Sequence, residues 1–317
     1  MTTTVAPAIT PFRLFDVELA RVERLCPSFR RLTLTGPELH RFADNGFDQR
    51  IKLLIPTTAP QARALGRLTG PDAVAADWYG AWRTLSDDER PALRTYTVRA
   101  SRPRMREIDV DVVQHGDLGP ASRWAGAARP GDRLVVCGPD AHHPGPHGGV
   151  DFAPPAHSRA VLMAGDETAV PAIASIIERL PRDARGEVLL EVPCTGDQLP
   201  IDRPTGITVT WLPRDGSGHG TRLVPAVQAA AARLLGSQGR PHDIHLDDVD
   251  VDQGLLWEVP VDADGGPLIA TTELYAWLAG EAGVIKALRR HLVSERGIDR
   301  RSVAFMGYWR LGRAESA

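Results

Sequence analysis

Two stretches of the chain combine arginine, aromatic and hydroxyl side chains in a way that suits a planar, phosphate-bearing ligand. In RTYTVR, residues 94–99, strand alternation places Arg94 and Tyr96 on one face. An aromatic ring beside an arginine can stack on a planar group while the guanidinium pairs with a phosphate. In HGDLGPASRW, residues 115–124, two glycines precede an expected helix start, whose free amide groups suit a diphosphate. The alternatives are an ordinary exposed strand and a turn that caps itself.

A third stretch, MAGDETAVPAI at residues 163–173, joins an apolar strand to a helix. Nucleotide phosphates dock at such junctions in α/β proteins. The usual GxGxxG pattern is absent, however, and Asp166 and Glu167 put two negative charges into the turn. Its composition alone therefore makes a poor phosphate loop.

Hydrophobic patterning in the first half predicts the elements that carry the first two stretches. Short apolar or β-branched runs, separated by Pro and Gly, predict six strands at 14–19, 31–35, 51–55, 95–98, 108–113 and 134–137. Such strands favour an antiparallel barrel or sandwich. Residues 57–92 interrupt the pattern and predict a helical or loop excursion.

The second half changes period and predicts strands alternating with helices. The strands are expected at 161–164, 188–192, 207–212, 274–279 and 303–309, and the helices at 171–180, 223–235 and 283–292. This alternation favours a parallel sheet covered on both faces, with ligands at the carboxyl ends of its strands. The segment 138–158 is rich in Pro, Gly and His, and it predicts a boundary between domains at 12–145 and 158–317.

Composition limits the classes of function. The net charge of −3 over 317 residues lacks the basic surplus of a nucleic-acid binder. No signal peptide or membrane-spanning run is visible, so we expect a cytoplasmic protein that binds no membrane. The three cysteines form no CxxC pair, which argues against a four-cysteine iron–sulfur cluster or a structural zinc. His142, His143 and His147 are expected in a surface loop, and the acidic stretch 248–252 lacks the pattern of a calcium loop. We therefore predict no metal site.

Five segments together resemble those of a known family. RTYTVR, HGDLGPASRWA, AGDETAVPAI, WLAGEA at 277–282 and GYWRLG at 307–312 occur in the order found in siderophore-interacting proteins. The chain thus resembles these flavin-dependent ferric-siderophore reductases of the ferredoxin–NADP reductase superfamily. The resemblance implies a six-stranded antiparallel FAD-binding barrel followed by a parallel-sheet domain that binds NADPH or NADH. Electrons would pass through FAD to Fe(III) held by a siderophore.

The resemblance also implies residue roles. Arg94 and Ser122 would hold the FAD diphosphate, Tyr96 would stack on the isoalloxazine, and Thr97 would hydrogen-bond near N5. The other residues around FAD would be Val113, His115, Gly116, Gly119, Pro120, Ala121, Tyr308, Trp309 and Arg310. The nicotinamide nucleotide would be met by Gly165, Asp166, Glu167, Thr168, Trp277, Ala279, Gly280 and Glu281.

Two residues bear on the choice of coenzyme. Glu191 ends the second α/β strand, where an acid usually bonds a ribose hydroxyl and repels a 2′-phosphate. Arg214 follows the third strand and matches, by order, an arginine that reads the 2′-phosphate in ferredoxin–NADP reductases. The two signs conflict, and the position of Arg214 favours NADPH.

An anionic ferric siderophore needs local positive charge. Lys52 matches a lysine that the family carries beside the flavin. Lys286 and Arg290 are four residues apart and so share a helix face, and Arg310 belongs to the C-terminal segment. We predict these four cations as the siderophore site, while the alternative for Lys286 and Arg290 is a solvated helix face. Two other functions stay open, namely a flavin reductase serving another acceptor and a non-catalytic siderophore carrier. We expect a monomer.

Overall fold

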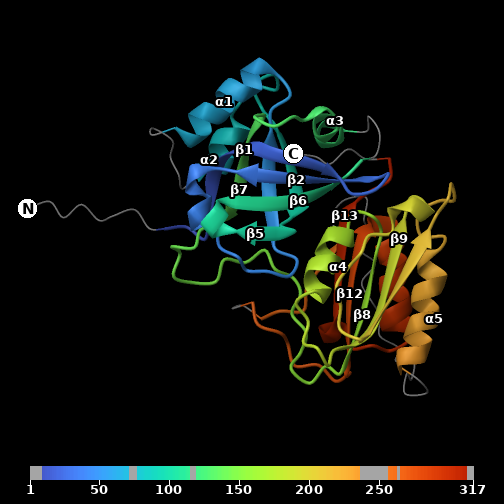
Figure 1. The fold of residues 1–317 in the computed structure, drawn as a ribbon. Helices are drawn as coiled ribbons and strands as arrows, with labels where there is room; N and C mark the ends of the chain where they lie inside the picture. Colours follow the sequence, from blue (N-terminus) through green and yellow to red (C-terminus); the bar gives the residue numbers. More distant parts are fainter. Residues whose placement is uncertain (1–8, 71–76, 115–118, 236–255, 263–264, 313–317) are drawn as a thin grey trace, which may run out of the picture.

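A computed structural model of the chain describes residues 9–70, 77–114, 119–235, 256–262 and 265–312. Two sheets dominate it, and Figure 1 shows them side by side, the first with residues of the N-terminal half and the second with residues of the C-terminal half. The strands of the first sheet lie within residues 12–139, and those of the second lie within 160–309.

The first sheet is antiparallel and has seven strands in the order β4-β3-β7-β1-β2-β6-β5. The strands are β1 Phe12–Arg24, β2 Phe29–Thr35, β3 Arg50–Ile55, β4 Ala92–Thr97, β5 Ala100–Arg102, β6 Glu107–Val113 and β7 Arg133–Pro139. Arg99, just past β4, donates its backbone N–H to the carbonyl of Asp109 on β6 at 2.8 Å. This bond ties the two ends of the sheet together, so the sheet curls as a barrel does.

The prediction of six strands is wrong by one. The missed strand, β5, has three residues and no apolar run, so hydrophobic patterning could not find it. It is held by pairing with the neighbouring β6, and Arg102 adds ion pairs with Asp109 at 2.7 Å and Glu107 at 3.1 Å on that strand.

The two faces of the first sheet bury different clusters. Alternate residues such as Phe15, Val17 and Leu19 fill the interior of the curl, as strand alternation requires. The opposite face carries Leu54 and Val135, which are covered by α1 Ala59–Thr69 and α2 Trp78–Arg83. Both helices lie in the excursion expected between residues 57 and 92.

The second sheet has six strands in the order β10-β9-β8-β12-β13-β11. Its parallel strands are β8 Ala160–Gly165, β9 Arg185–Val192, β10 Gly206–Pro213, β12 Leu274–Glu281 and β13 Val303–Trp309. The edge strand β11 Trp257–Glu258 runs antiparallel to β13, so the sheet is mixed rather than purely parallel. A two-residue strand is too short to show a period, which is why the sequence did not predict it.

Helices cover both faces of this sheet. On one face lies α4 Val170–Ile177, which is buried along its whole length because barrel residues such as Phe29 also pack into its cluster. The other face carries α5 Leu223–Leu235 and α6 Ala282–Arg289 in a separate cluster without barrel residues. The second sheet therefore turns its α4 face toward the barrel.

Buried polar contacts join the two sheets. Asp197, which follows β9, accepts hydrogen bonds from the backbone and hydroxyl of Ser28 at 2.8 Å and from the Cys26 thiol at 3.2 Å. Asp48, just before β3, accepts from the backbone N–H groups of Asp151 and Phe152 at 3.1 Å. The first set of contacts fixes the second half of the chain against the barrel, and the second fixes the segment between the two sheets against it.

Candidate functional site

The carboxyl ends of β8, β12 and β13 are held together by one buried carboxylate. Asp166, just past β8, is 3 % exposed. It accepts the backbone N–H of Thr168 at 2.9 Å, the backbone N–H of Glu281 at 2.8 Å and the indole N–H of Trp309 at 2.7 Å. Gly280 allows this approach, because a Cβ there would lie 2.7 Å from Asp166 Oδ2 and its φ is +149°. Asp166 therefore positions the ends of three adjacent strands.

Its neighbour Glu167 joins the ends of the strands on the other side. Glu167 is fully buried, and its carboxylate accepts hydrogen bonds from both terminal nitrogens of Arg214, at 2.6 and 2.8 Å. Arg214 follows β10, and it also lies 3.5 Å from Glu191 on β9. From sequence, these two consecutive acids argued against a phosphate-binding turn. In the structure both carboxylates point into the fold, where they accept hydrogen bonds from protein donors.

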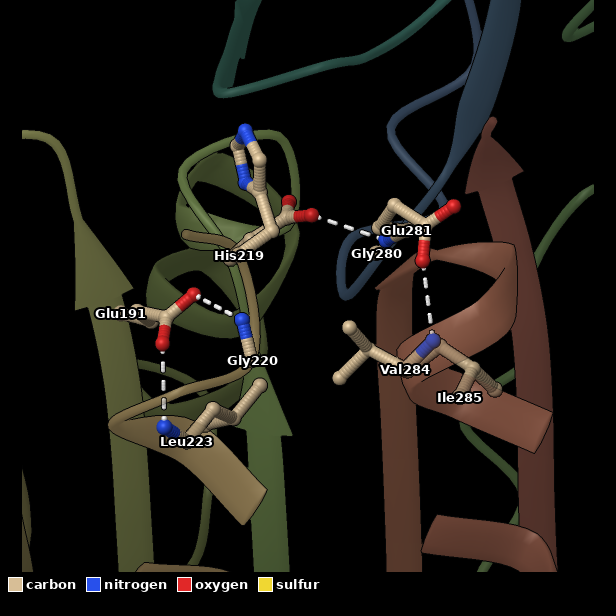
Figure 2. A pocket seen from close by; sticks show the side chains of 9 residues that line it. Glu191, His219, Gly220, Leu223, Gly280, Glu281, Val284 and Ile285 are labelled. Atoms are coloured by element: carbon tan, nitrogen blue, oxygen red, sulfur yellow. Dashed lines mark hydrogen bonds between the residues drawn. The ribbon is translucent and has the colours of Figure 1, made fainter. Parts of the chain in front are cut away.

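Glu191 is likewise turned inward. Its carboxylate accepts the backbone N–H groups of Gly220, Arg222 and Leu223 at 2.8 to 3.0 Å, at the start of α5. Figure 2 shows Glu191 reaching Gly220 and Leu223, while Glu281 accepts from Val284 in the first turn of α6. Two acids therefore cap the two helices that flank this edge.

A pocket lies between these caps, lined by Asp166, Glu191, His219, Gly220, Gly280 and Glu281 among others (Figure 2). The His219 ring stands edge-on to Trp309, with centroids 4.7 Å apart. Burial, and then the charge of Glu167, raise the pKa of Asp166 to about 6. The side-chain atoms of Asp166, Glu167 and His219 that could coordinate a metal ion lie within 4.8 Å of one another. Both oxygens of the Glu167 carboxylate, however, already accept hydrogen bonds from Arg214. A cation would have to displace that guanidinium.

On the first sheet, the register places two of the expected flavin residues, Arg94 and Tyr96, on one face. Arg94 pairs with Leu53 and Tyr96 with Ile51, so both side chains lie on the face that lines the barrel interior. Helix α3 Pro120–Ala127 packs against β3, β4 and β6. It carries the buried Ser122, and its N-cap residue is Gly119, which has no side chain of its own to cap the helix. A helix start at a glycine, near an arginine and a hydroxyl, suits a diphosphate, so these residues fit FAD.

Thr97 and Lys52 lie on the opposite face of the same strands. Lys52 pairs with Thr95, and its Nζ donates to the Thr95 hydroxyl at 2.6 Å. Thr97 is buried and pairs with Arg50. The face that Lys52 shares with Thr97 is therefore separate from the face of Tyr96.

An aromatic cluster links the second sheet to the barrel. Tyr308 stacks on Trp257 with centroids 5.7 Å apart, and it stands edge-on to Trp277 at 6.3 Å. The Arg50 guanidinium lies over the Trp257 ring at 4.5 Å. The Trp277 indole nitrogen and the Tyr308 hydroxyl are buried and lack a hydrogen-bond partner among the residues described. Sequence reasoning missed Trp257 and Arg50, because neither stands in one of the five segments.

The structure places two of the predicted acceptor cations, Lys286 and Arg290, away from the barrel. Lys286 belongs to α6 and the exposed Arg290 to the π-helix that follows it, on the face of the second sheet turned away from the barrel. Lys52 belongs to β3 of the first sheet. Arg310 follows β13 directly. His115, Gly116 and the acidic stretch 248–252 lie outside the described residues.

Comparison with known proteins agrees with this geometry. The model of the siderophore-interacting FAD-binding domain matches residues 18–143, and that of siderophore-interacting protein matches residues 158–312. An uncharacterized protein of Mycobacterium tuberculosis is 31 % identical over 316 residues, covering 96 % of this chain and 92 % of the relative. The chain belongs to the siderophore-interacting protein family.

Named relatives and solved structures extend this finding. The ferric vibriobactin reductase of Vibrio cholerae is 29 % identical, covering 96 % of this chain and 92 % of its own length. An NADPH-dependent ferric-chelate reductase of Escherichia coli is 27 % identical, covering 94 % and 93 %. The crystal structure of a siderophore utilization protein from T. fusca has a TM-score of 0.67 at 27 % identity, covering 97 % of this chain and 96 % of that one. The expected family and FAD cofactor are thus confirmed, and the fold of a barrel-like sheet followed by an α/β sheet is as expected.

Proposed function

We propose that this siderophore-interacting protein reduces Fe(III) in ferric siderophores, with electrons that NADPH or NADH supplies through FAD. The observation that carries this proposal is the likeness to the ferric vibriobactin reductase over 96 % of the chain. The arrangement of the sheets supports it. The barrel half offers helix α3, which starts after Gly119, carries Ser122 and packs against the strand of Arg94, and the second sheet offers the carboxyl edge of parallel strands.

The proposed division of labour follows the domains. Residues 12–145 would bind FAD, with Arg94, Ser122 and the first turn of α3 on the diphosphate and Tyr96 beside the ring. Residues 158–317 would bind the nicotinamide nucleotide at the edge held by Asp166 and Glu167. Bound FAD supplies the redox chemistry, because it accepts a hydride from a reduced nicotinamide and passes electrons on singly. The residues bind and orient, and none is required as an acid, base or nucleophile.

The acceptor would bind beside Lys52. The Lys52 ammonium lies on the sheet face that also carries Thr97, and it supplies positive charge in a chain whose net charge is −3. An anionic ferric chelate would be drawn to that face. Fe(II) binds hard oxygen chelators less tightly than Fe(III), so reduction would release the metal.

We infer a monomeric protein of the cytoplasm as the setting for this reaction. Within the described part of the chain, the helices are all too short or too polar to cross a bilayer. The three cysteines are unpaired in the structure, which suits a reducing compartment.

Absorbance spectroscopy on the purified protein tests the function. We expect a flavin spectrum that NADPH or NADH bleaches under anaerobic conditions and that a ferric siderophore then restores. A bleached flavin that responds only to other acceptors would indicate a general flavin reductase. Binding of the ferric siderophore without any bleaching would indicate a carrier.

A further inference from the structure

Arg214 is the residue whose sequence position and structural environment disagree most. Its side chain is 8 % exposed, and those of its partners Glu167 and Glu191 are 0 % and 1 % exposed. Both terminal nitrogens bind Glu167, at 2.6 and 2.8 Å, in the two-pronged geometry that gives strong arginine–carboxylate pairs. The donors that would read a 2′-phosphate are therefore already engaged.

A phosphate that took both terminal nitrogens of Arg214 in the same two-pronged way would have to displace Glu167. That carboxylate would then remain buried without its cation, which is strongly unfavourable in a protein interior. The other anion-binding feature at this edge is also occupied, because Glu191 accepts the N–H groups of Gly220, Arg222 and Leu223 at the start of α5. The chain thus satisfies both features with its own acids.

The same contacts give Arg214 a mechanical role. The side chain bridges the turn after β8 to Glu191 on β9, and its backbone N–H donates to the carbonyl of Val192 at 2.8 Å. It thereby holds the carboxyl ends of β8, β9 and β10 in place. The turn that it holds also contains Asp166, which anchors Trp309 and Glu281.

We propose that Arg214 is a positioning residue of the coenzyme edge, acting through its buried pair with Glu167, and that it does not bind the 2′-phosphate of NADPH. The proposal rests on the proposed function, since it concerns how the coenzyme edge is built. Loss of Arg214 should then weaken the binding of NADPH and of NADH by the same factor. If Arg214 instead bound the 2′-phosphate, its loss would lower the affinity for NADPH alone, by about 10- to 100-fold.

The test compares Arg214→Gln with the double variant Arg214→Gln/Glu167→Gln, in which both members of the pair are neutral and Glu191 keeps its three backbone donors. The probes are 2′,5′-ADP and 5′-ADP, titrated by calorimetry into the purified flavoprotein, and kcat/KM is measured with NADPH and NADH. Arg233→Gln is the matched control, because Arg233 also makes a two-pronged pair, through Nε and one terminal nitrogen at 3.1 and 2.6 Å from Glu187, on an exposed surface of α5 and β9. We expect this control to match the wild type.

We expect Arg214→Gln to weaken the binding of both nucleotide probes by the same factor, and we expect the double variant to restore the binding of both. If Arg214→Gln unfolds, the double variant alone decides, because a phosphate reader cannot be rescued by changing Glu167. Selective loss of 2′,5′-ADP in either variant would overturn the proposal, and so would unchanged binding of both probes in Arg214→Gln. Failure of the proposed function would show earlier, as a wild-type protein that oxidises neither coenzyme.

Discussion

Replacing Gly280 by alanine should displace the carboxylate that organises the nucleotide edge. Gly280 is the penultimate residue of β12, and its φ of +149° is one that residues with a side chain rarely adopt. A Cβ there would lie 2.7 Å from Asp166 Oδ2 and 2.8 Å from Asp166 Cγ. Asp166 cannot retreat without lengthening its bonds to Glu281 and Trp309, at 2.8 and 2.7 Å.

The magnitude follows from two costs. Holding a non-glycine residue in a disfavoured backbone region costs about 1–3 kcal/mol. Overpacking against a buried group, or the loss of two hydrogen bonds, adds about 1–3 kcal/mol. The sum of about 2–6 kcal/mol corresponds to a fall in Tm on the order of 10 °C for a domain of this size. The KM for NADPH should rise, whereas FAD content should hold, because Arg94 lies on β4 of the first sheet and Ser122 on α3, which packs against that sheet.

Gly216→Ala is the matched control. Gly216 has a φ of +90°, but a Cβ there would meet nothing within 4 Å, so this variant carries backbone strain without the clash. Thermal unfolding and steady-state kinetics of the two variants isolate the contribution of Asp166. Equal falls in Tm and equal KM values for the two variants would refute the reasoning.

Three further predictions concern other parts of the molecule. Arg94→Ala should weaken FAD binding by about 10- to 100-fold, through loss of a charge-assisted bond to the diphosphate. Fluorescence titration of released flavin measures this affinity. An unchanged affinity would remove Arg94 from the FAD site. Lys52→Glu should slow reduction of an anionic ferric chelate and flatten the salt dependence of that step, while anaerobic bleaching by NADPH stays as in the wild type; an unchanged acceptor rate would place the iron site elsewhere. Burial, and then the charge of Asp151, raise the pKa of Asp48 to about 6. The contribution of protonated Asp48 to the free energy of unfolding is therefore fully present below pH ~4 and is lost as the pH rises through about 6. Asp48→Asn should therefore be more stable than the wild type at pH 7 and show a flatter pH dependence between pH 4 and 6 in urea unfolding; an unchanged profile would contradict this.

Strand alternation made most of the first sheet predictable. The six expected strands are all present, and the expected shared face of Arg94 and Tyr96 is confirmed by the pairing of β4 with β3. The strands that escaped prediction, β5 and β11, have three and two residues. Pairing with a longer neighbour holds each of them, and no local pattern records that pairing.

The cations show where sequence reasoning ended. Lys286 lies on α6 and Arg290 opens the π-helix that continues it, but α6 packs on the face of the second sheet that carries no barrel residues. Which face a helix covers depends on the order of the strands that it connects. Helical periodicity shows that one side is apolar and leaves that choice open.

By itself, the sequence determined the two-part architecture and the family, because alternation, turn residues and the order of five motifs are local features. Only the tertiary structure decided what the charged residues do. Glu167 and Arg214 are 47 positions apart and meet because β8, β9 and β10 are neighbours in the sheet. Asp166 and Trp309 are 143 positions apart and meet across β12. A buried charge must find its partner wherever the fold supplies one, so its role follows from strand order, which no local pattern contains.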